Sequence, residues 1–292
     1  MRRIIALTLS MLMLLALAAC SGSPAQTEAP APAEADASAG SYTGVEDGVL
    51  TVGMECAYAP YNWTQMDDSN GAVPIKDSNE FANGYDVMIA KKICEANGWE
   101  LEVVRTDWDS LVPGVQTGIY DAVIAGQSMT EERMEQVDFA GPYFYASIVC
   151  VAKAGSAQAS VHSINDLTGT CTAQIATIWY DSMLPQIPNA TIQTAAADAP
   201  AMLMALETGM VDFICTDMPT AMGACAVYPD MTILDLSDGD FEADEGEINI
   251  GISLQKGNTA LREAIDSVIS TMTVADFNDL MDQAIAIQPL SE

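Results

Sequence analysis

Arg133 is the side chain of this sequence whose position most clearly suggests a chemical role. It follows Thr130-Glu131-Glu132, a pattern typical of the first turn of a helix, where the helix dipole disfavours a cation by about 0.3–1 kcal/mol. A negative partner should compensate for this. Glu131 or Glu132 could pair with Arg133 on the surface, or its planar guanidinium could grip a ligand carboxylate through two parallel hydrogen bonds. Arginine is scarce beyond residue 20, which favours the ligand.

Two further polar residues stand at the carboxyl ends of predicted strands, where open α/β sheets bind ligands. Ser128 follows the first of these strands, which ends near residue 125, and Asp217 follows the second, which ends near residue 215. Each could instead cap the helix that follows it. His162, the single histidine, has no cluster of cysteines or carboxylates beside it, and no C-x-x-C motif or phosphate loop occurs. We therefore expect no metal, no cofactor and no catalysis.

Short apolar, β-rich runs alternate with segments of helical periodicity along the chain. This alternation predicts an α/β fold with largely parallel sheets. The expected strands are 49–52, 101–104, 122–125, 148–152 and 211–215, and the expected helices are 86–97, 109–117, 200–208 and 258–272.

One pattern occurs twice: a helical segment, the motif Thr-Gly-x-x-Asp at 117–121 or 208–212, and then a strand. The glycine is the expected end of the helix, and the aspartate lies where the strand begins. Two copies predict two similar α/β lobes. Their strand ends would face one another across a cleft.

The N-terminus predicts export and a membrane anchor. Arg2 and Arg3 precede an apolar run over 4–19, which is shorter than the roughly 20 residues of a membrane-spanning helix. The run 17–20 resembles the bacterial lipobox, so we expect a lipoprotein signal peptide over 1–20 and lipidation at Cys20. An ordinary signal peptide with an incidental cysteine is the alternative. Residues 21–45, rich in Ser, Pro, Ala and Gly, predict a disordered tether.

Composition limits the partners and the redox chemistry. The chain has 41 acidic and 10 basic residues and a formal net charge of −31, so it lacks the basic face that nucleic acid requires. Several of the cysteines beyond Cys20 lie in apolar runs, where buried thiols are expected, although export also permits disulfides. These cysteines are Cys56, Cys94, Cys150, Cys171, Cys215 and Cys225.

The segments 53–63, 84–87, 107–113, 121–133 and 137–143, in this order, resemble the polar amino-acid solute-binding proteins of ABC importers, family 3. The resemblance covers nearly everything after residue 45. It implies a two-lobed periplasmic-binding-protein (Venus flytrap) fold with two hinge crossings, which let the lobes close on a ligand. Lobe 1 would comprise 46–146 and 247–292, and lobe 2 would comprise 147–246.

The resemblance also implies how an amino acid would be held. Tyr58 and Trp108 would form aromatic walls around the ligand side chain, with packing in the core as the alternative. Arg133 would clamp the α-carboxylate, assisted by Ser128 and by donors at Thr177. Such a guanidinium clamp suits a planar carboxylate.

The other end of the ligand would meet Asp217, as acceptor of the α-ammonium group, together with backbone around Gly126. Glu55 matches a position where relatives for basic amino acids carry an acid. Arg133 and Asp217 would balance the two charged ends of the ligand, so Glu55 would give the pocket one unbalanced negative charge. This charge favours lysine, arginine, ornithine or histidine. Alternatively, Glu55 could make a structural bond, which leaves glutamine or another polar amino acid open.

One departure from the family pattern concerns the segment before Trp179. Ala176 stands where many relatives carry glycine, and Ile178 removes a hydroxyl. A helix N-terminus there could still offer backbone N–H groups to a carboxylate. The role of Thr177 is therefore less firmly implied than that of Arg133.

The resemblance implies extracellular capture of a polar, cationic L-amino acid by a monomer. Its delivery would go to the permease of an ABC importer, with the protein lipid-anchored in the cell envelope at the outer face of the cytoplasmic membrane. Two rivals are a secreted dehydratase on the same fold and the sensing part of a receptor. No Ser-His-Asp set supports the first.

Overall fold

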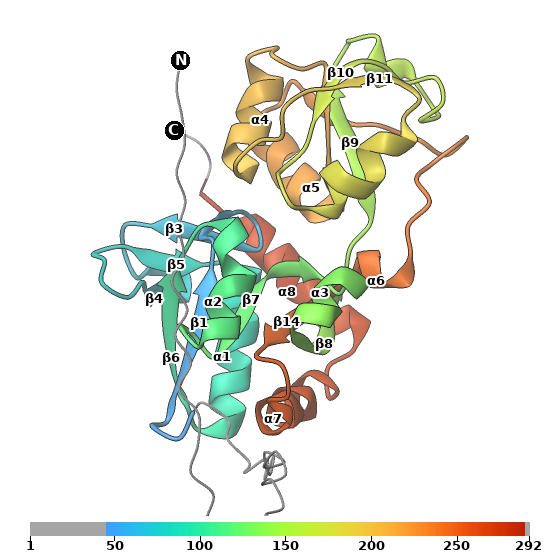
Figure 1. The fold of residues 1–292 in the computed structure, drawn as a ribbon. Coiled ribbons are helices and arrows are strands. Elements are labelled where there is room, and N and C mark those ends of the chain that lie inside the picture. Colours follow the sequence, from blue (N-terminus) through green and yellow to red (C-terminus); the bar gives the residue numbers. More distant parts are fainter. Residues whose placement is uncertain (1–44, 290–292) are drawn as a thin grey trace, which may run out of the picture. The chain divides into compact units, whose positions relative to one another are not determined.

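The computed structural model describes residues 45–289 (Figure 1). The predicted signal peptide with Cys20 and nearly all of the predicted tether lie outside these described residues. Within them, apolar strands form two five-stranded sheets and one small four-stranded sheet.

The first sheet has the strand order β6-β1-β7-β14-β8. β1 pairs in parallel with β6 and β7, whereas β14 runs antiparallel to both β7 and β8. Helix α1 contacts α7 and α8. The elements are β1 Val49–Met54, β6 Glu100–Arg105, β7 Ala122–Ser128, β8 Asp138–Tyr145, β14 Asn249–Leu254, α1 Tyr85–Asn97, α2 Leu111–Thr117, α7 Thr259–Ile269 and α8 Val274–Ile287.

The second sheet has the equivalent order β11-β10-β12-β9-β13. β10 pairs in parallel with β11 and β12, and β9 runs antiparallel to β12 and β13. The elements are β9 Ile148–Lys153, β10 Thr168–Thr172, β11 Asn189–Ile192, β12 Phe213–Asp217, β13 Met231–Ile233, α4 Ala199–Glu207 and α5 Met218–Val227.

A small antiparallel sheet and several short helices complete the described chain. The sheet has the order β2-β3-β5-β4. Its strands are β2 Ala57–Tyr58, β3 Asn62–Gln65, β4 Val73–Pro74 and β5 Phe81–Asn83, and the short helices are η1 Ser69–Gly71, η2 Trp108–Ser110, α3 Glu131–Gln136, η3 Gln158–Ser160, η4 Trp179–Met183, η5 Leu184–Gln186 and α6 Glu245–Ile248.

The expected α/β, two-lobed architecture is confirmed, but the prediction of largely parallel sheets is wrong for β9 and β14. β8 and β9 belong to different sheets and are joined by only Ala146 and Ser147, so the chain enters the second sheet at β9 without a helical crossover. β14 returns to the first sheet from the second. The two connecting segments lie side by side, since Ala146 N–H donates to the Ile248 carbonyl at 2.8 Å.

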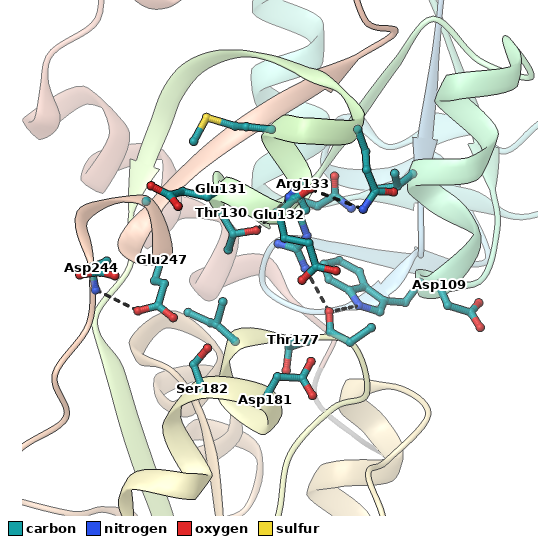
Figure 2. A pocket seen from close by; sticks show the side chains of 18 of the residues that line it. Asp109, Thr130, Glu131, Glu132, Arg133, Thr177, Asp181, Ser182, Asp244 and Glu247 are labelled. Carbon is teal, nitrogen blue, oxygen red and sulfur yellow. Dashed lines mark hydrogen bonds between the residues drawn. The ribbon is translucent and has the colours of Figure 1, made fainter.

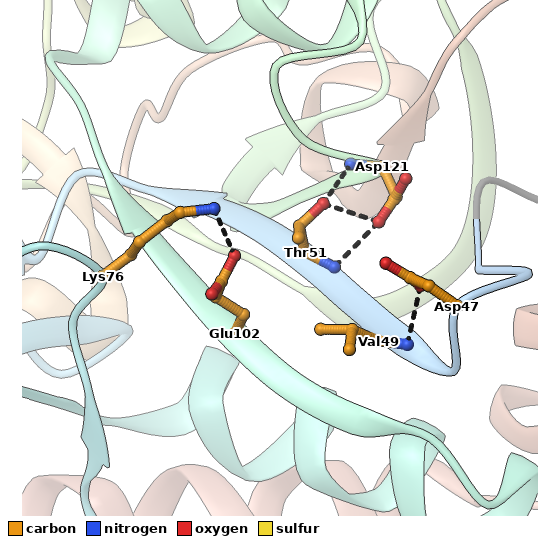
Figure 3. A network of polar contacts seen from close by, with 6 residues as sticks. All are labelled: Asp47, Val49, Thr51, Lys76, Glu102 and Asp121. Carbon is orange, nitrogen blue, oxygen red and sulfur yellow. Dashed lines mark hydrogen bonds and ion pairs between the residues drawn. The ribbon is translucent and has the colours of Figure 1, made fainter.

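The repeated Thr-Gly-x-x-Asp motif occupies the same place in both sheets. Gly118 and Gly209 end α2 and the α4 turn with φ of 72° and 74°. Asp121 accepts hydrogen bonds from the backbone N–H and hydroxyl of Thr51 in β1, as Figure 3 shows. Asp212 likewise accepts from the N–H and hydroxyl of Thr170 in β10, at 2.7 and 2.9 Å. Each aspartate therefore ties the start of the central strand of its sheet, β7 or β12, to the neighbouring strand, β1 or β10.

Candidate functional site

Six of the eight predicted ligand-binding residues line one small pocket. Its free volume is about 10 Å³, which is room for about one water molecule. The predicted residues Glu55 and Asp217 do not line this pocket but hydrogen bond to residues that do. The lining residues are Tyr58, Trp108, Gly126, Ser128, Arg133, Gln174, Thr177, Ile178 and Trp179.

Arg133 lies in the first turn of α3, whose N-cap Thr130 accepts the Arg133 N–H through its side chain. Its guanidinium donates to the carbonyl of Ser128 at 2.9 Å and to that of Ala176 at 3.0 Å. Across residues 45–289, no carboxylate forms an ion pair with Arg133, so the predicted alternative, a surface pair with Glu131 or Glu132, is absent there. Burial lowers the pKa of Arg133 to about 10, which leaves it charged at neutral pH.

Trp108 contributes a second donor to the same acceptor as Arg133. Its indole N–H donates to the Ala176 carbonyl at 3.2 Å, and the Arg133 guanidinium lies over its ring at 5.5 Å. Ala176 has a φ of 54°, a left-handed conformation that costs a residue with a Cβ roughly 1–2 kcal/mol. Ala176, at the position where the family resemblance implies glycine, therefore has the backbone conformation that glycine favours.

Thr177 uses its hydroxyl within its own turn. The hydroxyl donates to the Gln174 carbonyl at 2.7 Å and accepts the Tyr180 N–H at 3.4 Å. The helix expected after this segment is η4, a π-helix of five residues, rather than an α-helix. Its first residue, Trp179, points an aromatic ring at the pocket, with its centroid 5.9 Å from that of Tyr58.

Asp217 lies at the end of β12 and caps α5 at the same time. One carboxylate oxygen accepts the Thr220 N–H at 2.9 Å, and the other accepts the Thr220 hydroxyl at 3.0 Å. The Tyr58 hydroxyl donates to that second oxygen from the first sheet's side of the site. Burial raises the pKa of Asp217, and its hydrogen bonds oppose that shift. Capping and a place beside the pocket are thus compatible.

The ring of Tyr58 is held between a second tyrosine and a glycine. It stacks on Tyr61, with centroids 4.7 Å apart. A Cβ added to Gly126, whose φ is 64°, would lie 2.6 Å from the Tyr58 ring. The Gly126 N–H donates to the Tyr143 hydroxyl, which in turn donates to the buried Asp86. Gly126 is therefore required both for its backbone conformation and for the space that it leaves.

Glu55 directly follows β1 and is buried. Gln174 donates its side-chain amide to both carboxylate oxygens of Glu55, at 3.2 and 3.3 Å. Burial raises the pKa of Glu55 to about 7, although the Gln174 hydrogen bond lowers it. The loop behind Glu55 is fixed by Asn62, which accepts the Cys56 N–H at 2.7 Å.

The sequence prediction missed Gln174, Ile178 and Trp179 as pocket residues. All three follow β10, a strand that the prediction also missed because its Thr-rich sequence has few large apolar residues. A polar side chain directly after a parallel strand was the available signal, as it was for Asp217.

A wide groove of about 860 Å³ adjoins the small pocket and shares Trp108, Arg133, Thr177 and Ile178 with it. Figure 2 shows the carboxylates of α3, η4 and α6 around this groove. Arg133 is the one basic residue among those lining it. The acidic ones are Asp109, Glu131, Glu132, Asp181, Asp244, Glu245 and Glu247.

Other chemistry is sparse in the described part of the chain. The six cysteines beyond Cys20 are free thiols there, and five of them are buried. Residues 45–289 contain no cluster of three or more His, Cys, Asp or Glu side chains arranged for a metal ion. Over the same residues, no helix combines the length and the apolar character needed to cross a membrane.

Comparison with known proteins gives a consistent set of relatives. A probable histidine-binding protein of Campylobacter jejuni is 29% identical over 183 residues, which are 62% of this chain and 65% of the relative. The chain therefore spans just under two thirds of that protein. The L-cystine-binding protein TcyJ of Escherichia coli is 26% identical over 227 residues, 78% of each chain.

Among solved structures, the L-arginine-bound substrate-binding protein AbpA of an amino acid ABC transporter from Streptococcus pneumoniae is similar. It has a TM-score of 0.70 and 26% identity, and the match covers 82% of this chain and 95% of that one. The family model for bacterial extracellular solute-binding proteins, family 3, matches residues 50–283. Because this match spans most of the chain, the protein belongs to the bacterial extracellular solute-binding proteins, family 3.

Proposed function

We propose that this protein captures a polar amino acid with a cationic side chain outside the cytoplasm and delivers it to an ABC importer. Its relatives include proteins described as binding histidine or L-cystine and one solved with L-arginine. These relatives support an amino acid as the ligand, but the amino acids in their descriptions have different side chains. The choice among side chains therefore depends on the charges of the site.

The environment of Glu55 is the main evidence for a cationic side chain on the ligand. Its buried carboxylate is bound only by the neutral amide of Gln174 among the described hydrogen bonds, and no lysine or arginine in residues 45–289 pairs with it. An isolated buried carboxylate is costly and raises its own pKa, here to about 7. A ligand ammonium or guanidinium would relieve this cost.

The remaining charges match the two ends of a zwitterion. Arg133 would take the α-carboxylate and Asp217 the α-ammonium, so their charges cancel those of the ligand backbone. Tyr58 and Trp108 would flank its side chain, with Ser128, Thr177 and the backbone at Gly126 completing the site.

The acidic groove supports the same preference at longer range. Seven carboxylates and one guanidinium line it beside the pocket. A cleft lined by one sign of charge raises the local concentration of the opposite ion, although salt screens this effect beyond about 8 Å. Cationic amino acids would therefore be enriched at the entrance and acidic ones excluded.

Titration calorimetry with a panel of amino acids tests the proposal. We expect tight binding of arginine, lysine, ornithine or histidine and weak binding of glutamine and cystine. Glu55→Gln should weaken the cationic ligand by more than about tenfold, or 1.4 kcal/mol, and leave glutamine unaffected. Tight glutamine binding with no response to arginine or lysine would reject the cationic side chain. Turnover of a prephenate-like substrate would instead support the dehydratase alternative.

The anchor and the partner are also part of the proposal. We infer that Cys20 is lipidated and holds a monomer at the outer face of the cytoplasmic membrane, within reach of the importer's permease. Cys20→Ala should release the protein from membranes and abolish its labelling by a radioactive fatty acid. Retention of the label in this variant would exclude lipidation at Cys20.

A further inference from the structure

Each of the three charged groups of the site is already bound by another group of the protein. Arg133, in α3, is bound by the Ala176 carbonyl, which follows β10 of the second sheet. Glu55, which follows β1 of the first sheet, is bound by the Gln174 amide. Asp217, at the end of β12, is bound by the Tyr58 hydroxyl of β2. Every one of these contacts joins residues that lie on different lobes.

The chemistry of each partner corresponds to a different part of an amino acid. A carbonyl oxygen on Arg133 stands in for a carboxylate oxygen. A hydroxyl donor on Asp217 stands in for an ammonium N–H. An amide N–H on Glu55 stands in for a nitrogen at the end of a side chain. The three contacts thus have the donor and acceptor pattern of a bound ligand.

The pocket is too small to hold an amino acid while these three contacts are in place. A free volume of about 10 Å³ admits about one water molecule and no amino acid. Tyr58, Gln174 and the Ala176 segment must therefore move before a ligand reaches the charged groups. Since these contacts connect the two lobes, their release also frees the lobes to separate.

We propose that the protein's own Tyr58 hydroxyl, Gln174 amide and Ala176 carbonyl hold the site shut, and that the ligand binds by exchanging with all three. This inference rests on the proposed function for the identity of the ligand. It requires of the ligand an α-carboxylate, an α-ammonium group and a side chain that ends in an N–H donor, and the cationic amino acids of the proposed function meet all three requirements. A ligand that lacks any of the three groups would leave a buried charge unpaired.

Self-closure lowers the apparent affinity for the ligand. When only a fraction of the molecules is competent to bind, the apparent Kd equals the intrinsic Kd divided by that fraction. Removing one closing contact without removing a ligand contact should therefore tighten binding. The Tyr58 hydroxyl is the best target, because phenylalanine keeps the ring and its stacking on Tyr61.

The test compares Tyr58→Phe with Tyr61→Phe in the purified full chain. Tyr61 is the matched control, because its ring is the other half of the same stacked pair and its buried hydroxyl has no partner among the described residues. Hydrogen–deuterium exchange without ligand reads the closure directly. Tyr58→Phe should speed exchange in peptides over 54–62, 172–180 and 217–220, and Tyr61→Phe should not.

Calorimetry with L-arginine provides the second measurement. We expect Tyr58→Phe to bind about tenfold more tightly than the parent chain, the scale of one hydrogen bond to a charged group. Unchanged exchange, or weaker arginine binding in Tyr58→Phe, would overturn self-closure. Gln174→Leu provides an independent exchange measurement and should also speed exchange over 54–62. If neither arginine nor glutamine bound the parent chain, the proposed function would fail, and the exchange data would still decide this inference.

Discussion

Replacing Arg133 by alanine removes the guanidinium that the site offers to a carboxylate. In the structure this group gives one N–H to Ser128 and one to Ala176, at 2.9 and 3.0 Å. The bond from the charged Arg133 to the neutral Ala176 carbonyl is already charge-assisted, so exchange of that carbonyl for a carboxylate adds the attraction between two opposite charges, on the order of 1 kcal/mol. Leaving a bound carboxylate without a partner costs about 1–3 kcal/mol more. The sum, about 2–4 kcal/mol, raises Kd by at least roughly 30-fold.

Calorimetry with the tightest-binding amino acid of the panel measures this change. Arg105→Ala is the matched control, since Arg105 is partly exposed and pairs with Glu80 at 2.7 Å, outside the pocket. Its Kd should match that of the parent chain. Arg133→Lys keeps the charge but loses the planar guanidinium, so its Kd should lie between that of Arg133→Ala and that of the parent chain. A rise of less than about tenfold in Arg133→Ala would refute the carboxylate clamp.

Two further predictions concern Glu55 and Gly126. Because burial raises the pKa of Glu55 to about 7, a cationic ligand must expel a proton below that pH, so the arginine Kd should rise by up to about tenfold per pH unit below 7 and level off above it. A flat profile between pH 5.5 and 8.5 would contradict this. The folded-state pKa of Glu55 exceeds its ordinary value of 4.5, so ionisation of Glu55 lowers the free energy of unfolding as pH rises from 4.5 to 7. Over that window the free energy of unfolding of Glu55→Gln, measured by chemical denaturation, should rise by up to about 3 kcal/mol relative to the parent chain. Gly126→Ala should lose about 1–3 kcal/mol more stability than Gly118→Ala, because both have positive φ but only Gly126 faces the Tyr58 ring. Equal losses in the two variants would show that the clash is unimportant.

Local sequence signals identified the elements that position the site. The predicted strands and helices are present with boundaries shifted by a few residues, because hydrophobic periodicity is a local property. Gly118 and Gly209 end their helices as their motif indicated. Arg133 and Asp217 were identifiable because one lies early in a helix and the other directly after a strand.

Long-range pairing was less accessible from the sequence. The antiparallel directions of β9 and β14 depend on how the chain crosses between the sheets, and no local pattern reports this. Gln174 and Trp179 join the pocket only because β10 lies beside β12. The partner of Arg133 could not be deduced either, because a backbone carbonyl carries no sequence signature.

The sequence by itself determined the order of α/β elements, the repeated lobe unit and the residue types that can bind a carboxylate and an ammonium group. Those properties follow from periodicity, capping and charge, which depend on neighbours along the chain. Only the tertiary structure decided that Tyr58, Gln174 and Ala176 reach Asp217, Glu55 and Arg133, because each pair lies far apart in sequence and meets only when both sheets have formed.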